Sequence, residues 1–456
     1  MISMTTRSFL LTGSALGFLF GSTSTGFAAD DAAAPAQLPA VSVEATVPPP
    51  AEGSTEAGYR VKNADLGPMG SRKVQDTPYS ITTIPADLME TQQVRNISDI
   101  IKYNPSAQIE PRGDLDFGRP QTRGFENSST QNTRIDGLNS YTIMAYPMEE
   151  YQDLEILNGA AGALYGASSP GGTFNFVSKR PTDTPMQRLT LGYDSLGSFS
   201  EHGEASGQVG AFGYRLNALH GQGEGYVSTS SQERELLSAN FDVRLNDSTK
   251  LELNGSGYKD NENGFPSALV YGSGKIPASA GSGTIPSAGA ALASNLPAAL
   301  DPTKAGYGVV GAGQHLQDED VSARLIHAFS PDWKLTVGGM YQNVDRTENP
   351  SGTYGAADPG NWLMSNGKIA TIVGDTGLHT EVDSDIAYLN GHVETGSLTH
   401  DLILGTNGYQ QTGYNRKGMN YQLGTASCPP RWFITIRPTA IRGRSANRPM
   451  AASRLW

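Results

Sequence analysis

The segment from Tyr151 to Thr182 constrains the fold of this chain more than any other part of the sequence. It contains two short apolar runs, around Leu154 and around Phe176, and five glycines lie between them. Glycine adopts positive φ and lets backbones approach closely at little steric cost. The segment therefore predicts two strands joined by tight, irregular turns inside a small domain.

Residues 60–182 as a whole predict a compact α/β domain. A helix is expected over Ile97–Tyr103, because Asn96 and Asp99 are placed to cap its N-terminus. Pro105 prevents the helix from continuing. The domain is expected to end just after the second apolar run, at the sequence Lys179-Arg180-Pro181.

From about residue 187 the sequence changes to a period of two. Between Phe212 and Leu219, apolar side chains alternate with polar or small ones, and residues 239–245 and 333–342 repeat the pattern. One apolar face and one polar face are what a wall between lipid and water requires. A soluble β-sandwich would also alternate, so the connections between strands must distinguish the two.

The connections alternate between short and long. Short turns are expected at residues 210–211, 246–248, 330–332 and 396–397, and long segments at about 222–233, 261–317 and 346–381. A membrane β-barrel has tight turns on one side and long loops on the other. The pattern predicts residues 187–426 to be a barrel wall, with about nine strands before residue 425.

The N-terminus predicts an exported protein. Residues 1–28 resemble a signal peptide, with an apolar stretch from Phe9 to Phe20 and a small-residue cleavage site near Ala28. Residues 29–59 are rich in Ala and Pro and predict an extended tether. Within this tether, residues 38–45 alternate as a strand that lacks a partner, although a plain linker is the alternative.

Three motifs occur in order: Arg-Gly-Phe, Asp-Gly-Leu, and the glycine-rich segment. Together they resemble the plug domain of TonB-dependent outer-membrane receptors, in particular the siderophore receptors. The matching residues are Arg123, Gly124, Phe125, Asp136, Gly137, Glu155, Gly159, Tyr165, Gly166, Pro170, Gly171, Gly172 and Asn175.

The resemblance implies an α/β plug domain (60–182) followed by a membrane antiparallel β-barrel. That barrel is apparently truncated, because about nine of roughly 22 strands are present. It also implies that residues 38–45 form a TonB box, which pairs with the energy-coupling protein TonB by strand addition. The residues of this box are Leu38, Pro39, Val41, Ser42, Val43 and Glu44.

The function implied is active uptake of a ferric siderophore across the outer membrane of a Gram-negative bacterium. The expected partners are TonB with its inner-membrane complex, the ferric chelate and outer-membrane lipid. No cofactor or metal site of the protein itself is expected, because the iron belongs to the chelate. An anionic, aromatic chelate would suit four candidate ligand-binding residues, which are Arg112, Phe117, Tyr141 and Tyr146.

The chain also departs from the family pattern. Asp153, Asn158 and Ala160 stand where an Arg, another Arg and a Pro are usual, so the family's arginine latch between plug and barrel is not carried over.

Residues 427–456 contain six arginines and no acidic residue. This basic tail, without period, suggests a frameshift, and a divergent natural end is the alternative. Two other functions stay open: a truncated non-transporting fragment, and a receptor for another chelate such as cobalamin.

Composition excludes other classes. The net charge of −12 argues against nucleic-acid binding, and Cys428 is the only cysteine, so no intramolecular disulfide can form. After residue 30 no run of eighteen apolar residues predicts a membrane helix. The sequence has no phosphate-binding loop, zinc-protease motif or nucleophile elbow, so we do not expect an enzyme.

Overall fold

The computed structural model describes most of the chain after residue 49. The described residues are 50–111, 118–142, 146–159, 161–166, 168–194, 197–224, 230–264, 269–270, 274–276, 283–285, 313–349, 360–363, 368–427 and 451–455. The predicted signal peptide, most of the tether, the TonB box, Arg112 and Phe117 lie outside them. No helix within the described ranges has the length and apolar character needed to cross a membrane.

A five-stranded sheet forms the centre of the plug domain. In spatial order its strands are β3 (Ile81–Pro85), β8 (Tyr151–Leu157), β9 (Thr173–Ser178), β6 (Thr133–Ile135) and β7 (Leu138–Asn139). β8 and β9 are the two strands that the glycine-rich segment predicts, and they pair antiparallel. Leu154, Ile156, Phe174 and Phe176 are at most 1% exposed and form the core between this sheet and its neighbours.

The predicted helix over Ile97–Tyr103 forms as α2 (Ile97–Ile100) followed by a 3₁₀ turn, η3 (Ile101–Tyr103). Asn96 and Asp99 make the expected capping box, in which the Asn96 side chain accepts from the Ser98 N–H at 2.9 Å. The other plug elements are β1 (Asn63–Asp65), η1 (Gly67–Met69), β2 (Ser71–Lys73), η2 (Val74–Asp76), α1 (Ala86–Thr91), β4 (Ala107–Pro111), β5 (Gly118–Thr122), η4 (Met148–Glu150) and α3 (Gly162–Tyr165).

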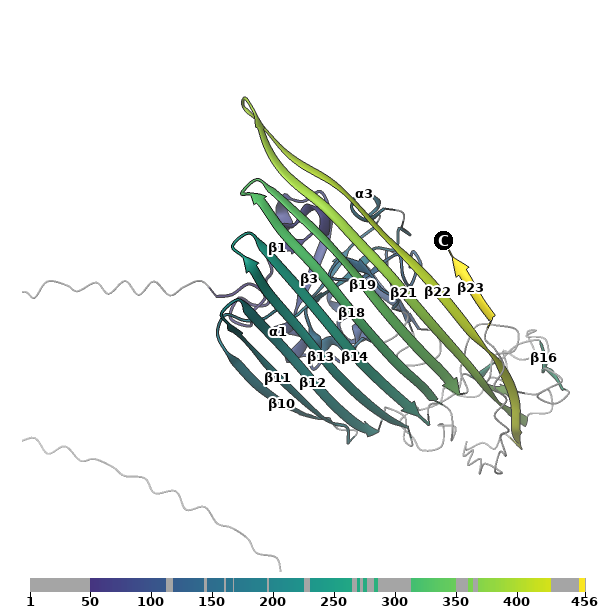
Figure 1. Ribbon diagram of the computed structural model, residues 1–456. Coiled ribbons are helices and arrows are strands. Elements are labelled where there is room, and N and C mark those ends of the chain that lie inside the picture. Colours follow the sequence, from purple (N-terminus) through teal and green to yellow (C-terminus); the bar gives the residue numbers. More distant parts are fainter. Residues whose placement is uncertain are drawn as a thin grey trace, which may run out of the picture. The chain divides into compact units, whose positions relative to one another are not determined.

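A large antiparallel sheet follows the plug (Figure 1). It contains 12 strands, of which β15 (Leu269–Val270), β20 (Gly360–Leu363) and β23 (Ala451–Leu455) are short, so nine long strands make the wall. These are β10 (Met186–Tyr193), β11 (Phe199–Val209), β12 (Phe212–Glu224), β13 (Ser231–Asn246), β14 (Thr249–Asn263), β18 (Gly313–Ser330), β19 (Trp333–Asn349), β21 (Lys368–Thr395) and β22 (Leu398–Ser427). A separate hairpin pairs β16 (Gly274–Ile276) with β17 (Gly283–Ile285).

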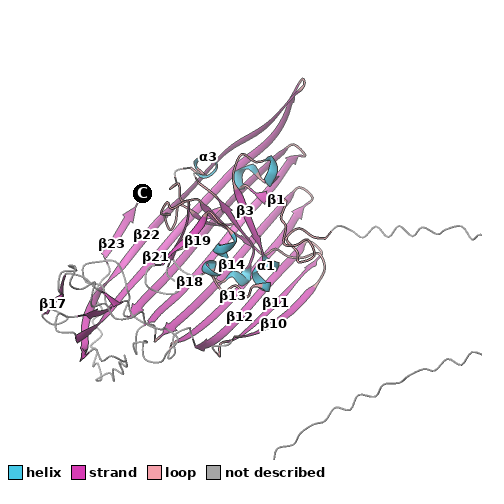
Figure 2. Ribbon diagram, turned by 180° about the vertical axis from the view of Figure 1, so that it is seen from behind, coloured by secondary structure: helices cyan, strands magenta, loops and turns pink. Residues whose placement is uncertain are grey.

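The wall has apolar side chains on the face away from the plug and polar ones on the face toward it. On β12, Phe212 and Leu216 are 42% and 41% exposed, whereas Arg215 and Asn217 are buried. Figure 2 shows the plug helices and short strands against one side of the long strands. A soluble sandwich has the opposite arrangement. The predicted plug followed by a partial β-barrel is therefore confirmed.

The predicted positions of the four short turns are correct, but the strands are longer than predicted at their other ends. β19 continues to Asn349 and β21 begins at Lys368, inside the segment 346–381 that the sequence predicts to be a loop. Apolar residues such as Ile369, Ile372 and Val373 do not alternate strictly with polar ones there, so the period-two signal disappears although the backbone pairing continues. We call this side of the wall the loop end, and the side with the short turns the turn end.

One short segment of the tail forms a strand. Residues 451–455 form β23, which pairs antiparallel with Gln411–Asn415 of β22. The tail sequence has no period of two and so does not indicate this strand. Backbone hydrogen bonding to an available strand edge does not require such a period.

Candidate functional site: the seam between plug and wall

The plug signature residues meet in one hydrogen-bonded network. The Asn175 side chain accepts from the Gly137 N–H at 2.9 Å and donates to the Glu155 carboxylate at 2.9 Å. The other Glu155 oxygen accepts from the backbone N–H of Asp65 at 2.7 Å. Asp136 accepts from the Ser178 N–H at 2.9 Å. The network ties the N-terminal strand β1, nearest the tether, to the central sheet.

The Arg-Gly-Phe and Pro-Gly-Gly motifs form adjoining turns. Arg123 and Gly124 have φ of 56° and 74°, and the preceding Thr122 N–H donates to the Gly171 carbonyl at 2.7 Å. A Cβ on Gly171 would lie 2.4 Å from the Phe125 carbonyl oxygen, so only glycine fits. Arg123 itself is exposed, as is Phe125, which is 53% accessible.

The Leu-Tyr-Gly motif holds a buried arginine. Tyr165 is 6% exposed, and the Arg134 guanidinium lies 4.1 Å from the centre of its ring. Arg134 also donates to the Gly137 carbonyl at 2.7 Å. The tyrosine thus links α3 to the turn of the Asp-Gly motif. Gly166 follows with a φ of 77°, and Pro170 is exposed.

Two of the candidate ligand-binding residues are buried. Tyr141 is 6% exposed and packs against inward apolar side chains of the wall, including Leu219 and Leu316. Tyr146 is 5% exposed, and its hydroxyl donates to the Tyr141 carbonyl at 2.8 Å. In this conformation neither side chain is exposed to solvent. Here they bind the plug to the wall, and a role in ligand binding stays a prediction.

Ion pairs hold the plug exit against the first wall strands. The Glu204 carboxylate on β11 has no exposed side-chain surface and lies 3.0 Å from Lys179 Nζ. Arg215 and Arg188 approach the same carboxylate at 2.7 Å and 2.5 Å. Arg188 also makes a bidentate pair with Glu90 of α1, at 2.7 and 2.8 Å. The Glu204 carboxylate therefore forms ion pairs with one cation of the plug, Lys179, and with two cations of the wall.

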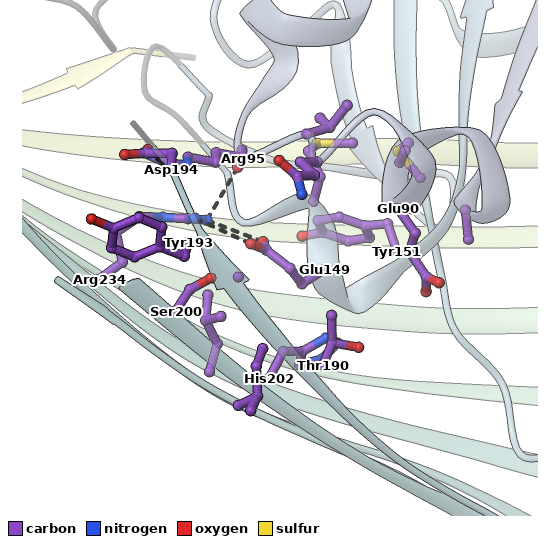
Figure 3. Close-up of a pocket in the computed structure, with 18 of the residues that line it drawn as sticks. Glu90, Arg95, Glu149, Tyr151, Thr190, Tyr193, Asp194, Ser200, His202 and Arg234 are labelled. Carbon is purple, nitrogen blue, oxygen red and sulfur yellow. Dashed lines mark hydrogen bonds and ion pairs between the residues drawn. The ribbon is translucent and has the colours of Figure 1, made fainter. Parts of the chain in front are cut away.

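A second cluster lies beside a cavity between plug and wall. Arg234 of β13 donates to both oxygens of Glu149 at 3.1 and 3.0 Å, and also to the Arg95 carbonyl at 3.1 Å. Figure 3 shows Arg234 and Glu149 pointing toward each other. The cavity has a volume of about 170 Å³ and is lined by charged groups that already have partners, together with apolar side chains such as Met148 and Leu219. The cavity therefore leaves unfilled space next to the ion pair between Arg234 and Glu149.

The seam also contains a like-charge region. Glu150 of the plug is buried near Asp320 of β18, and burial first, then the charge of Asp320, raises the pKa of Glu150 to about 8. Asp318 is buried nearby and accepts from Gln342 at 3.0 Å. This part of the seam therefore contains buried carboxyl groups close together, beside the Arg324 side chain of β18, which donates to the Asp136 carbonyl of the plug at 3.3 Å.

Sequence reasoning did not identify the seam residues Glu149, Arg234 and Glu204. Each is charged, and each is buried or half-buried at the contact between plug and wall. Charges at inward-facing positions of β11 to β13 were the available signal. Their partners are distant in sequence, and periodicity alone does not identify them.

Glu155 is expected to make the stability of the plug depend on pH. Burial first, and then the charge of Asp65, raises its pKa to about 8 from an ordinary value of 4.5. Its stabilising contribution is therefore complete below pH 4.5 and is lost as the pH rises through about 8. We expect Glu155→Gln to equal the parent in urea midpoint at pH 5 and to exceed it at pH 9. An equal difference at both pH values would contradict this. Glu150, whose pKa is also raised, is present in both proteins, so its effect on the urea midpoint cancels in the comparison.

Comparison with known proteins agrees with this architecture. The family model for the TonB-dependent receptor plug domain matches residues 73–173. The chain is 23% identical over 425 residues to the ferrichrome receptor of Yersinia enterocolitica, covering 87% of this chain and 50% of that protein. It is 24% identical over 359 residues to the ferrioxamine B receptor of Salmonella typhimurium, covering 75% of this chain and 47% of the relative.

Solved structures share the fold. The ferric preacinetobactin receptor of Acinetobacter baumannii superposes with a TM-score of 0.64 at 20% identity, covering 82% of this chain and 54% of that one. The ferripyoverdine receptor of Pseudomonas aeruginosa gives 0.62 at 19% identity, with 77% and 45% covered. This chain thus spans about half the length of the relatives that it matches. Residues 73–173 thus match the plug domain of TonB-dependent receptors, and the fold is that of a plug domain followed by part of a β-barrel.

Proposed function

We propose that this protein takes part in the active uptake of a ferric siderophore across the outer membrane. The relatives named above are receptors for ferrichrome and ferrioxamine B. The observation that carries the proposal is the wall, whose apolar face points away from a matched plug domain. This arrangement suits a plugged passage through a lipid layer.

The seam suggests how the plug is both held and released. Its contacts include ion pairs, such as Lys179 with Glu204 and Arg234 with Glu149, as well as apolar packing around Tyr141. When plug and wall separate, water can form hydrogen bonds to the charged groups that are exposed. An apolar interface would instead lose the free energy of burying its surface, with no new hydrogen bonds in return. A polar seam beside a cavity therefore favours a plug that can move.

The tether would deliver the force for that movement. Residues 38–45 are proposed as the strand that pairs with TonB. Pulling on the tether would load β1 first, where the Asp65 N–H is bound to Glu155 at 2.7 Å. The plug signature would then be the first part of the domain to respond. Arg112 and Phe117 remain proposed contacts for the chelate.

Deleting codons 38–45 from the chromosomal gene is expected to abolish uptake but not binding of the chelate. Iron-starved cells would be given a panel of ⁵⁵Fe-labelled hydroxamate, catecholate and citrate chelates, with cobalamin as a separate arm. We expect uptake of one ferric chelate to fall at least about tenfold, while its binding to cells is unchanged. A deletion of the same length in residues 30–37, which lie in the predicted tether before the box, is the matched control.

The outcomes separate the two parts of the proposal. If deletion of the whole gene leaves uptake of every chelate unchanged, the proposed function is wrong. If whole-gene deletion abolishes uptake but deletion of residues 38–45 does not, only the TonB box is misassigned. Dependence on cobalamin alone would replace the ferric chelate as substrate.

A further inference from the structure

Three potential metal ligands converge on the outward face of the wall, away from the plug. They are His220 on β12, and Glu233 and Glu235 on the neighbouring β13. His220 lies directly opposite Glu235 in the antiparallel register, and Gln222 lies opposite Glu233. All three side chains therefore point to the same side, since residues two apart share a face of a strand.

Their ligand atoms are close enough for one ion. One imidazole nitrogen and one oxygen from each carboxylate all lie within 4.8 Å of one another. Two ligands at about 2.1 Å from a tetrahedral metal are roughly 3.4 Å apart. Rotation of two flexible glutamate side chains supplies the remaining approach of at most about 1.4 Å.

The surroundings favour a cation. Glu201 of β11 is opposite His220 on the other side, which adds a second carboxylate, after Glu235, to the row of His220. The nearest basic residue in that row is Lys259, which lies opposite Glu235 on β14. The row therefore has more negative than positive charge. It begins directly beyond the outward apolar residues Leu216 and Leu237, where the wall leaves its apolar band toward the loop end.

We propose that His220, Glu233 and Glu235 form a binding site for a divalent transition-metal ion such as Zn²⁺. An imidazole with two carboxylates suits Zn²⁺, whereas Ca²⁺ and Mg²⁺ prefer oxygen ligands alone. The ion would join β12 to β13 on the outside of the wall. It is separate from any iron in a transported chelate, and the site does not depend on the proposed function.

Zn²⁺ titration of the purified full chain in detergent micelles, by calorimetry in a chelate-free buffer, tests the site. We expect one tight Zn²⁺ per chain, and affinity at least about tenfold weaker in His220→Gln and in the double variant Glu233→Gln/Glu235→Gln. Co²⁺ should give a visible absorption band that disappears in the same variants. Excess Ca²⁺ should not displace the bound ion.

Two control variants make the result decisive. His400→Gln removes an exposed histidine elsewhere on the wall, and Glu319→Gln removes a carboxylate from another part of the outward face; both should bind Zn²⁺ like the parent. The proposal is overturned if the controls weaken binding as much as the site variants. It is also overturned if no tight Zn²⁺ binds, or if Ca²⁺ competes equally and His220→Gln has no effect.

Discussion

Replacing Glu204 by glutamine is expected to lower the free energy of unfolding of the chain by about 3–5 kcal/mol. The Glu204 side chain has no exposed surface and is bound by Lys179, Arg215 and Arg188, at 3.0, 2.7 and 2.5 Å. Glutamine keeps the size but removes the negative charge, so that buried Lys179 and Arg215 lose the carboxylate that compensates them. Urea unfolding in detergent, followed by tryptophan fluorescence, measures the change.

The matched control is Asp183→Asn. This carboxylate is 94% exposed and lies 4.0 Å from Arg244, which is itself 61% exposed. Exposed pairs of this kind contribute about 0–1 kcal/mol, so the control should unfold close to the parent. Equal losses in the two variants would show that the seam does not depend on the buried carboxylate. A protease-resistant plug should also be lost in Glu204→Gln and kept in Asp183→Asn.

Replacing Gly172 by alanine is expected to cost about 3 kcal/mol or more, and to reduce the yield of folded plug. Gly172 has a φ of +92°, and an added Cβ would lie 2.7 Å from Thr122 Oγ1 and 2.9 Å from the Leu157 carbonyl oxygen. The residue thus combines an unfavourable backbone conformation with a fixed backbone atom that cannot move aside. The same urea experiment and limited proteolysis measure the effect.

Gly137→Ala separates the two contributions. Gly137 has a similar φ of +84°, but nothing lies within 4 Å of an added Cβ. Only the backbone penalty applies there, about 1–2 kcal/mol. If Gly172→Ala costs no more than Gly137→Ala, the close approach of the Pro-Gly-Gly turn to Thr122 and Leu157 is not limiting. A much larger cost at Gly172 supports the packing explanation.

Much of the fold follows from local sequence signals. The alternation of apolar and polar residues from Phe212 to Leu219 indicates both a strand and its apolar face. Successive side chains of a strand point to opposite faces, and one face of this wall is apolar while the other is polar. The same logic fails beyond that band, where apolar and polar residues no longer alternate strictly. Residues 368–381 of β21 therefore predict a loop, although backbone pairing with β22 continues through them.

The site was less accessible to sequence reasoning. The motif residues Asp136, Glu155 and Asn175 are recognisable as a set, and the structure joins Glu155 and Asn175 at 2.9 Å. Arg234 and Glu149, by contrast, are 85 residues apart and pair only through the packing of plug on wall. No local pattern specifies a partner at that separation. Tyr141 shows the same difficulty, since its wall contacts come from strands that follow much later.

The hairpin of β21 and β22 has a consequence for the height of the wall. The two strands contain 28 and 30 residues, which at about 3.3 Å per residue corresponds to roughly 90–100 Å. About 9–11 tilted residues are enough to cross the hydrocarbon of a bilayer. A hairpin of this length placed in a bilayer would therefore have most of its residues outside the hydrocarbon. The wall begins on its other side with β10, which contains only 8 residues, so the two sides differ greatly in height.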